Sequence, residues 1–287
     1  MNINLSHGLL GCMLVGFTQA ATAAVPQQPP QLQLGYYQVS DASLEQVPGS
    51  GEFTIKETHL SGKLGKKETP LGTLLIGANY QQHRFELASN YTSRTLHQLA
   101  LPVTLVNKSD QWTIVSQVAP SLNTDFEELD KDDYTTTALL RAAYHHSDTT
   151  TWVAGAAFDR SFGDSQLYPV LGVNYTPNNN WLLQLTLPRM VVKYMPRPRT
   201  IIYWQAQPNG NKWNVDVPAI NRSINITTKA IRSGIGIEFN ITQQWWIKAE
   251  AGREFNRNLE TINDGGVEFD LDVEDAYYLG ASIFFRI

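Results

Sequence analysis

Residues 277–287 read YYLGASIFFRI and alternate between two kinds of side chain. One file is apolar and comprises Tyr277, Leu279, Ala281, Ile283, Phe285 and Ile287. The other is small, aromatic or charged and comprises Tyr278, Gly280, Ser282, Phe284 and Arg286. Successive side chains of a β-strand point to opposite faces, so a period of two predicts a strand with one apolar face.

The same alternation recurs upstream of this segment. An apolar file at Trp245, Ile247, Ala249 and Ala251 opposes one with charged residues, and residues 231–240 and 181–187 repeat the pattern. Beyond residue 31, no helix-length segment combines a clear 3.6-residue period with helix caps. We therefore predict an all-β chain.

Composition indicates which solvent the apolar face meets. The 287 residues are 42% apolar but only 17% charged, with a mean hydropathy of -0.26 and a net charge of -5. In a typical soluble protein, about a quarter of all residues are charged. The low charge favours a barrel with lipid outside and polar residues inside. No apolar run is long enough for a transmembrane helix, and the negative charge argues against a nucleic-acid partner.

Four tryptophans follow short polar segments and each begins an alternating strand. The segments NKSDQ, SDTTT, TPNNN and ITQQ precede Trp112, Trp152, Trp181 and Trp245. A fixed distance from a tight turn places these indoles at one height, and indoles gather at membrane interfaces. Good packing at strand starts is the alternative explanation, but it does not account for the repeated coupling to turns. We predict a girdle of membrane-interface aromatic residues.

Short and long connections alternate along the chain, as in outer-membrane barrels. The segments around residues 65–70, 107–111, 146–150, 176–180, 195–199 and 240–244 form the short side, whereas residues 121–133 and 258–275 form long acidic connections. This predicts one single-domain, closed antiparallel transmembrane β-barrel with both termini in the periplasm. It has about 14 strands if 181–187 and 190–195 are separate, and about 12 if they are one strand bent at Pro188.

The first residues are interpreted as a targeting segment. Residues 8–17 are apolar and residues 21–23 are small, which predicts a signal peptide at 1–23, cleaved near Ala23. Leu9 to Cys12 resembles a lipoprotein box, which is the alternative. A Pro/Gln-rich linker is predicted at 24–31 and the barrel at 32–287. Without Cys12 the mature chain has no thiol, which suits an oxidising compartment.

Three segments between residues 118 and 194 carry a family resemblance. In order they read VAPSLNTDFEELD, YPVLGVNYTPNNNWLLQLTLPR and KYMPRP. They resemble an uncharacterised bacterial family of outer-membrane β-barrels, known only as a domain of unknown function. The resemblance implies the outer membrane of a Gram-negative bacterium and supplies no activity, so no catalytic residue carries over. Such barrels commonly end in Phe or Trp for recognition by the barrel-assembly machinery, whereas this chain ends in Ile287.

Charged residues on the polar faces of the last strands are candidate lumen residues. They are Arg232, Glu238, Lys248, Glu250, Glu254 and Arg286. Because an unpaired charge in a narrow lumen is costly, we predict pairs of opposite charge across neighbouring strands. Pairing predicts a partly blocked interior, and a narrow substrate channel is the other interpretation.

The remaining polar clusters do not predict a catalytic or metal site. Residues 145–148 (HHSD) are neighbours in one turn and point in different directions, so a polar turn is the preferred interpretation. The acidic loops lack the spacing of a defined calcium loop and are interpreted as solvated, with divalent cations the alternative. No glycine-rich phosphate loop precedes a helix, so no cofactor is predicted.

Three functions remain open from sequence. The leading hypothesis is a structural barrel or a narrow channel for a small solute. The alternatives are an outer-membrane enzyme that modifies lipid and a soluble periplasmic β-barrel that binds an apolar ligand. The predicted partners are outer-membrane lipid and lipopolysaccharide, the barrel-assembly machinery and a small solute.

Overall fold

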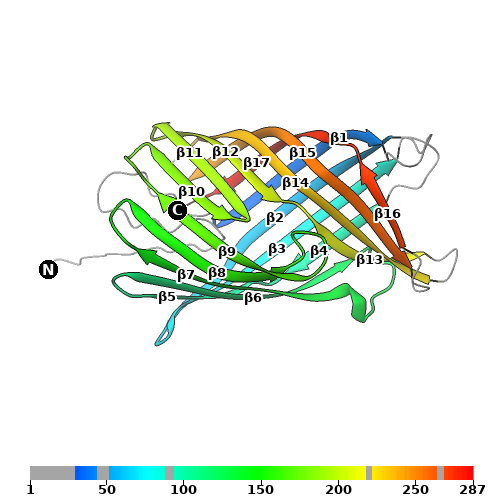
Figure 1. Cartoon of the computed structure of the whole chain (residues 1–287), viewed down its shortest axis with the longest axis horizontal. Helices are drawn as coiled ribbons and strands as arrows, with labels where there is room; N and C mark the ends of the chain where they lie inside the picture. Colours follow the sequence, from blue (N-terminus) through cyan, green and yellow to red (C-terminus); the bar gives the residue numbers. More distant parts are fainter. Residues whose placement is uncertain are drawn as a thin grey trace.

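The computed structural model describes residues 30–43, 52–87, 94–217, 222–242, 244–263 and 268–286. The predicted signal peptide and most of the linker lie outside these residues. The described residues form one sheet that closes on itself where β1 pairs with β17 (Figure 1). The elements are β1 (Leu32–Ser43), β2 (Glu52–Thr69), β3 (Gly72–Leu87), β4 (Arg94–Ala100), β5 (Val103–Lys108), β6 (Trp112–Thr124), the 3-10 helix η1 (Lys131–Asp133), β7 (Tyr134–His145), β8 (Thr150–Asp159), β9 (Gln166–Tyr175), β10 (Trp181–Leu187), β11 (Arg189–Arg197), β12 (Thr200–Pro208), β13 (Asn211–Val217), β14 (Arg222–Asn240), β15 (Trp245–Asn263), β16 (Glu268–Val273) and β17 (Ala276–Phe285).

These segments make a barrel of 14 antiparallel strands. In three cases two segments lie end to end against the same neighbouring strand and count as one strand of the barrel. These are β4 with β5, β12 with β13, and β16 with β17. β10 and β11 pair in antiparallel fashion from Thr186↔Arg189 to Trp181↔Tyr194, so they are separate strands. The predicted closed antiparallel barrel is confirmed, and the larger of the two strand numbers is correct.

All the predicted short connections lie at one end of the barrel. The β2–β3 connection is the two-residue turn Pro70 and Leu71, after which Gly72 has a φ of 128°. A Cβ at Gly72 would lie 2.3 Å from the carbonyl oxygen of Val106, so this position requires glycine. The first and last strands meet at the same end, where Leu32 pairs with Phe285 (Figure 1).

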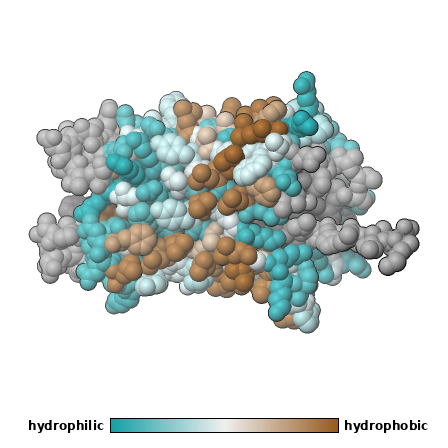
Figure 2. Space-filling view, turned by 180° about the vertical axis from the view of Figure 1, so that it is seen from behind, coloured by the Kyte–Doolittle hydropathy of each residue, from teal (hydrophilic) through white to brown (hydrophobic). Residues whose placement is uncertain are grey.

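The outer wall is apolar and the inner face is largely polar. On β17, Tyr277 and Leu279 are 70% and 68% exposed, whereas Tyr278 between them is 1% exposed. Figure 2 shows apolar side chains across the middle of one face, with hydrophilic side chains toward the two ends. Closure pairs the backbone of the wall apart from one edge of β9, and lipid favours such pairing because it offers no hydrogen bonds. Among the described residues, no helix has the length and apolar character needed to cross a membrane.

The barrel wall is uneven in height. β14 and β15 contain 19 residues each, whereas β10 contains 7 and β11 contains 9. In Figure 1 the β10–β11 hairpin therefore ends well short of the neighbouring β12, β13 and β14. In the described sheet, β10 pairs with β9 only from Leu171 to Tyr175, so residues 166–170 have no strand partner on that side.

Candidate functional site

A buried arginine lies at the centre of the barrel interior. Arg232 on β14 places Nη2 2.7 Å from Oε1 of Glu57 on β2 and 2.6 Å from Oε1 of Glu254 on β15. Arg257 Nε lies 3.4 Å from the other oxygen of Glu254, and His83 Nδ1 lies 3.8 Å from Glu57. The arginine and both carboxylates have side chains at most 5% exposed, so their charges are compensated by one another rather than by water.

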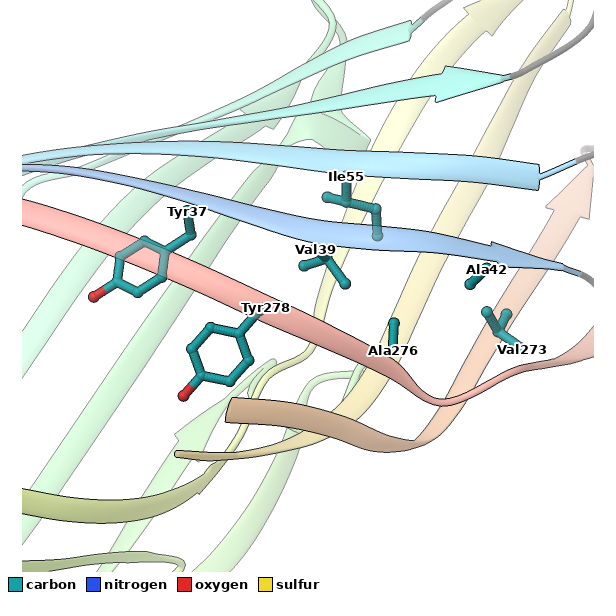
Figure 3. Close-up of a cluster of buried hydrophobic side chains, with 7 residues drawn as sticks. All are labelled: Tyr37, Val39, Ala42, Ile55, Val273, Ala276 and Tyr278. Carbon is teal, nitrogen blue, oxygen red and sulfur yellow. The ribbon is translucent and has the colours of Figure 1, made fainter. Parts of the chain in front are cut away.

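Two tyrosines contact the same guanidinium. Arg232 Cζ lies 4.8 Å from the ring centroid of Tyr278 and 5.3 Å from that of Tyr37, within the range of cation–π attraction. Figure 3 shows these rings beside one another at one end of an apolar cluster formed by β1, β2, β16 and β17. This cluster comprises Tyr37, Val39, Ala42, Ile55, Val273, Ala276 and Tyr278. The aromatic rings thus join the apolar cluster to the charged network.

A second network surrounds Glu250, whose side chain has no exposure. Lys248 Nζ lies 2.9 Å from Oε2, and the Tyr203 hydroxyl donates to the same oxygen at 2.6 Å. The hydroxyl of Tyr278 and the amide of Gln205 donate to Oε1 at 2.5 and 2.7 Å. Four donors fully satisfy a buried carboxylate, so this group is fixed in place.

A third ion-pair group lies nearer the short-turn end. Glu238 lies 3.6 Å from Nζ of Lys193 and 3.5 Å from Nη2 of Arg286. The Arg286 guanidinium also lies 4.8 Å from the Phe284 ring centroid and 5.0 Å from that of Trp246. The three groups together fill the interior beside β14, β15 and β17 with paired charges.

The structure places all six proposed lumen residues inside the barrel and brings them together in these networks. Sequence reasoning missed several of their partners, among them Glu57, Lys193, Tyr203 and Arg257. Lys193 lies between Val192 and Tyr194, an alternation of the kind that identified Lys248. Glu57 had no such signal, because β2 carries polar residues on both faces.

At the long-loop end of the lumen, contacts cross the interior between opposite walls. β13 bends inward, and Trp213 and Val215 pack on Leu96 of β4, all at most 1% exposed. The Asn211 amide donates to Asn123 of β6 at 3.4 Å. Asn214 donates to Asp130, the residue that caps η1, at 3.0 Å. We call this set the mouth contact; it combines an apolar contact with hydrogen bonds between opposite walls.

Two adjacent cavities lie below the mouth contact. The first, of about 320 Å³, is lined by the ion-pair groups Glu57, Glu254 and Arg257 and by Trp213. The second, of about 380 Å³, lies against β7 to β11. They share the polar lining residues Gln81, Gln117, Thr137, Asp159 and Ser161, together with Pro208. The interior therefore holds polar space, although neither cavity is a wide water column.

The four tryptophans lie on the outer surface at the short-turn end. Trp112, Trp152, Trp181 and Trp245 are 46%, 54%, 39% and 39% exposed, and each is at or near the start of its strand. Ring neighbours accompany three of them: Tyr144 at 4.9 Å from Trp112, Tyr194 at 4.8 Å from Trp181 and Phe285 at 5.2 Å from Trp245. Their placement at a membrane interface stays a prediction.

The polar turn at residues 145–148 does not assemble a catalytic group among the described residues. His145 hydrogen-bonds to threonine hydroxyls, Nε2 to Thr113 at 3.0 Å and Nδ1 to Thr151 at 3.1 Å. In the acidic segment 125–133, Asp130 and Asp133 form a capping box on η1. Across the described ranges, no group of three or more His, Cys, Asp or Glu side chains is placed to hold a metal ion.

The family model for the Domain of unknown function DUF6268 matches residues 59–287. The chain belongs to this family. No curated protein matches the DUF6268 chain in sequence.

Among solved structures, the DUF6268 chain is similar to the NanC porin, with 12% identity and a TM-score of 0.41. The matched region covers 89% of this chain and 100% of the porin. It is also similar to an outer membrane channel from Pseudomonas putida F1 (10%, 0.43; 88% and 94% covered). A third similar structure is outer membrane phospholipase A from Escherichia coli (12%, 0.34; 92% and 95% covered). At these identities and TM-scores the likeness carries no argument about activity, and the closed barrel is established by the strand pairing of this chain itself.

Proposed function

We propose that this barrel spans the bacterial outer membrane and conducts a small polar solute through a narrow, gated lumen. The observation that carries the proposal is the lumen itself: two adjacent cavities that share polar lining residues lie inside a closed wall whose outer face is apolar. The mouth contact at Trp213 blocks the long-loop end in this conformation. Opening that contact is the step that would admit solute.

The lumen chemistry favours small, uncharged or mixed-charge solutes. The cavities are lined by amides, hydroxyls and charges of both signs, and the carboxylates of the three ion-pair groups each face at least one cation. A field of one sign would select ions strongly, whereas paired charges cancel. We therefore expect weak selectivity between cations and anions.

Single-channel recording in a planar bilayer tests the proposal. The refolded wild-type barrel should show brief, small conductance steps, because the mouth contact keeps most molecules closed. A bilayer that stays silent for the wild type and for variants that loosen the mouth contact would contradict a channel. Folding is checked first by heat-modifiable migration of unboiled samples after detergent extraction.

The alternatives give different outcomes in the same preparation. A lipid-modifying enzyme would release fatty acid from phospholipid vesicles. In the hydrogen bonds of the described residues, the histidine rings contact Tyr80, Thr113, Thr151 and Glu57, and none contacts a serine hydroxyl. A soluble periplasmic barrel would remain in solution without detergent, which its exposed apolar wall argues against.

The proposal includes the route to the membrane. A signal peptide at 1–23 would be removed near Ala23, and mass spectrometry of the mature amino terminus tests this. The barrel-assembly machinery would insert the chain, with the outer wall then meeting lipid and lipopolysaccharide. A diacylated Cys12 would instead establish the lipoprotein alternative.

A further inference from the structure

The barrel wall has a gap above the β10–β11 hairpin. β9 residues 166–170 on one side and β12–β13 on the other face each other there, and the described sheet places no strand between them. The hairpin turns at Leu187 and Pro188, which therefore border the gap on the side of the short turns. The opposite edge of β9 remains paired with β8 as far as Asp159↔Gln166, so the gap is local.

The gap lies at the height of the apolar band of the wall. Leu187 is six residues from Trp181 along β10. For a tilted strand this corresponds to a height of about 15 Å, whereas the apolar band of outer-membrane barrels is about 25 Å tall. Beside the gap, Leu167 and Leu171 of β9 face outward and are 73% and 53% exposed. The gap therefore opens toward lipid rather than toward water.

The second cavity reaches this gap. Its lining includes Tyr168 and Val170 of β9, the rim residues Leu187 and Pro188, and Gln207 and Pro208 of β12. Leu187 is 57% exposed, so it belongs both to the outer surface and to the cavity lining. The cavity thus reaches the wall at a residue that is also exposed on the outer surface.

The β8–β9 loop covers the cavity on the long-loop side. Arg160 Nη1 donates to the carbonyl oxygen of Lys212 on β13 at 2.9 Å, and Lys212 Nζ lies 3.0 Å from Asp164. Gly163 packs on Thr227 and Lys229 of β14, so the loop crosses the interior. With the loop above and the mouth contact beyond it, the gap is the direct route between this cavity and the surroundings.

The cavity has the two-sided chemistry of an amphiphile site. Leu139, Ala157, Val170 and Val191 supply an apolar side. The polar side contains Arg141, Asn174, Gln184, Thr186 and Arg189, while Asp159 at the loop end is engaged by the Tyr168 hydroxyl at 2.6 Å. Arg189 has a buried Nε with no hydrogen-bond partner among the described residues. A buried guanidinium with an unused donor fits an anionic head group.

We propose that the gap is a lateral portal, through which a single-chain amphiphile with a carboxylate head exchanges between this cavity and the membrane. The head would bind at Arg189 and the apolar body would extend past Val170 and Leu187. A volume of about 380 Å³ lies at the low end of the range of small-molecule sites, so it excludes a diacyl lipid. This rests on the proposed channel function and extends it. Besides the small polar solutes that the paired charges of the lumen favour, it adds a second class of solute, the carboxylate amphiphile, and a route for it through the wall.

Photolabelling from within a bilayer tests the portal. The mature barrel is reconstituted in phosphatidylcholine vesicles that contain decanoate with a photoreactive diazirine at its methyl end, and labelled peptides are located by mass spectrometry. We expect label on inward-facing Tyr168, Val170 and Val191, and protection by excess decanoate. The methyl ester of the probe, which has no charge, should label outward residues alone.

Matched variants separate the portal from the background of membrane labelling. Arg189→Gln should reduce the inner labelling about ten-fold or more, because a charge-assisted contact is lost. Arg197→Gln, on the same strand but exposed, should leave it unchanged. Val170→Trp should fill the gap and abolish inner labelling, whereas Leu171→Trp on the outer face should not. Heat-modifiable migration establishes that each variant is folded.

The outcomes are decisive in both directions. Equal inner labelling by the ester, wild-type labelling in folded Arg189→Gln, or label confined to outward residues would overturn the portal. Conductance in the planar bilayer without inner labelling would reject the portal and leave the channel standing. Inner labelling with a silent bilayer would support the carboxylate site and reject conduction.

Discussion

Arg232 and Glu57 are 175 positions apart in the chain, yet their side chains meet at 2.7 Å inside the barrel. Arg232 belongs to β14 and Glu57 to β2, which lie on opposite sides of the β15–β17–β1 portion of the wall. Their pairing therefore crosses the lumen. It ties together two parts of the wall that share no backbone hydrogen bond.

Removing this cation should destabilise the barrel strongly. Arg232→Gln would leave Glu57 and Glu254 buried, and unpairing a buried charge costs about 3–5 kcal/mol. Glu57→Gln should cost less, because Arg232 keeps Glu254. Urea unfolding in detergent measures both. The control is Arg84→Gln on the surface, where the pair with Glu86 at 3.0 Å contributes less than about 1 kcal/mol. Equal losses for Arg232 and Arg84 would show that the network does not hold the wall.

Trp213→Ala should open the mouth contact. Truncation removes the indole that packs on Leu96 and Val215, and we expect larger and longer conductance steps than in the wild type. The measurement is single-channel recording. Trp204→Ala is the matched control, because Trp204 lies on the outer wall and is 37% exposed. If Trp213→Ala folds and conducts like the wild type, the mouth contact is not the gate.

The sequence predicted the barrel well where its strands have one apolar file. β17 and the first half of β15 follow the alternation, and the lumen residues Lys248, Glu250 and Glu254 are found from it. The alternation between inward and outward side chains is interrupted by a bulge in β15 near Asn256, whose φ is 52°. The register with β14 shifts there, between Lys229 and Ile231. Beyond that bulge Arg257 points inward although it is an odd number of residues from Glu254.

Other features depended on relationships that no local pattern contains. β13 leans across the lumen because β11 ends too early to pair with it, so Trp213 became a buried mouth residue rather than a wall residue. The gap above Pro188 likewise follows from the different lengths of β9, β10 and β12. A sequence shows a tight turn at Pro188, but it does not show how high the neighbouring strands continue.

The mouth should respond to pH through its loop. Burial raises the pKa of Asp125 and of Asp133, which both lie in the β6–β7 connection outside the strands. A carboxyl whose pKa is raised in the folded loop stabilises that loop in its protonated form. The stabilisation is complete below the ordinary Asp pKa of about 3.9 and is lost as the pH rises through the raised pKa of the folded state. The titratable and charged groups that face these carboxyls are Glu127, Asp130, Asp216, Arg94 and His97.

We therefore expect lower open probability at about pH 4 than at about pH 7 in the planar bilayer. The double variant Asp125→Asn and Asp133→Asn should stay in the low-pH behaviour at both values. Asp148→Asn, in the exposed short turn, is the control and should keep the wild-type response. A response that persists unchanged in the double variant would assign the pH dependence to other groups.

The four outer tryptophans should report one depth in the membrane. Nitroxide labels on single cysteines at positions 112, 152, 181 and 245 are expected to give equal depths near the head groups by power saturation. Ile237 faces outward and precedes the short-turn end of β14. A label there should lie deeper, in the acyl region. Four unequal depths would contradict the girdle and would favour packing at strand starts.

Ile287→Phe should speed insertion of the barrel. The last described strand ends at Phe285, which pairs with Leu32 and lies 5.2 Å from the Trp245 ring, so the closing seam is aromatic already. A Phe at position 287 supplies the residue type that is commonly recognised during assembly. We expect a larger folded fraction at early times after induction, measured by heat-modifiable migration. Ile287→Val is the matched control, since it keeps an aliphatic end. Equal folding rates for Phe and Val would mean that Phe285 and its apolar file are already sufficient as the assembly signal.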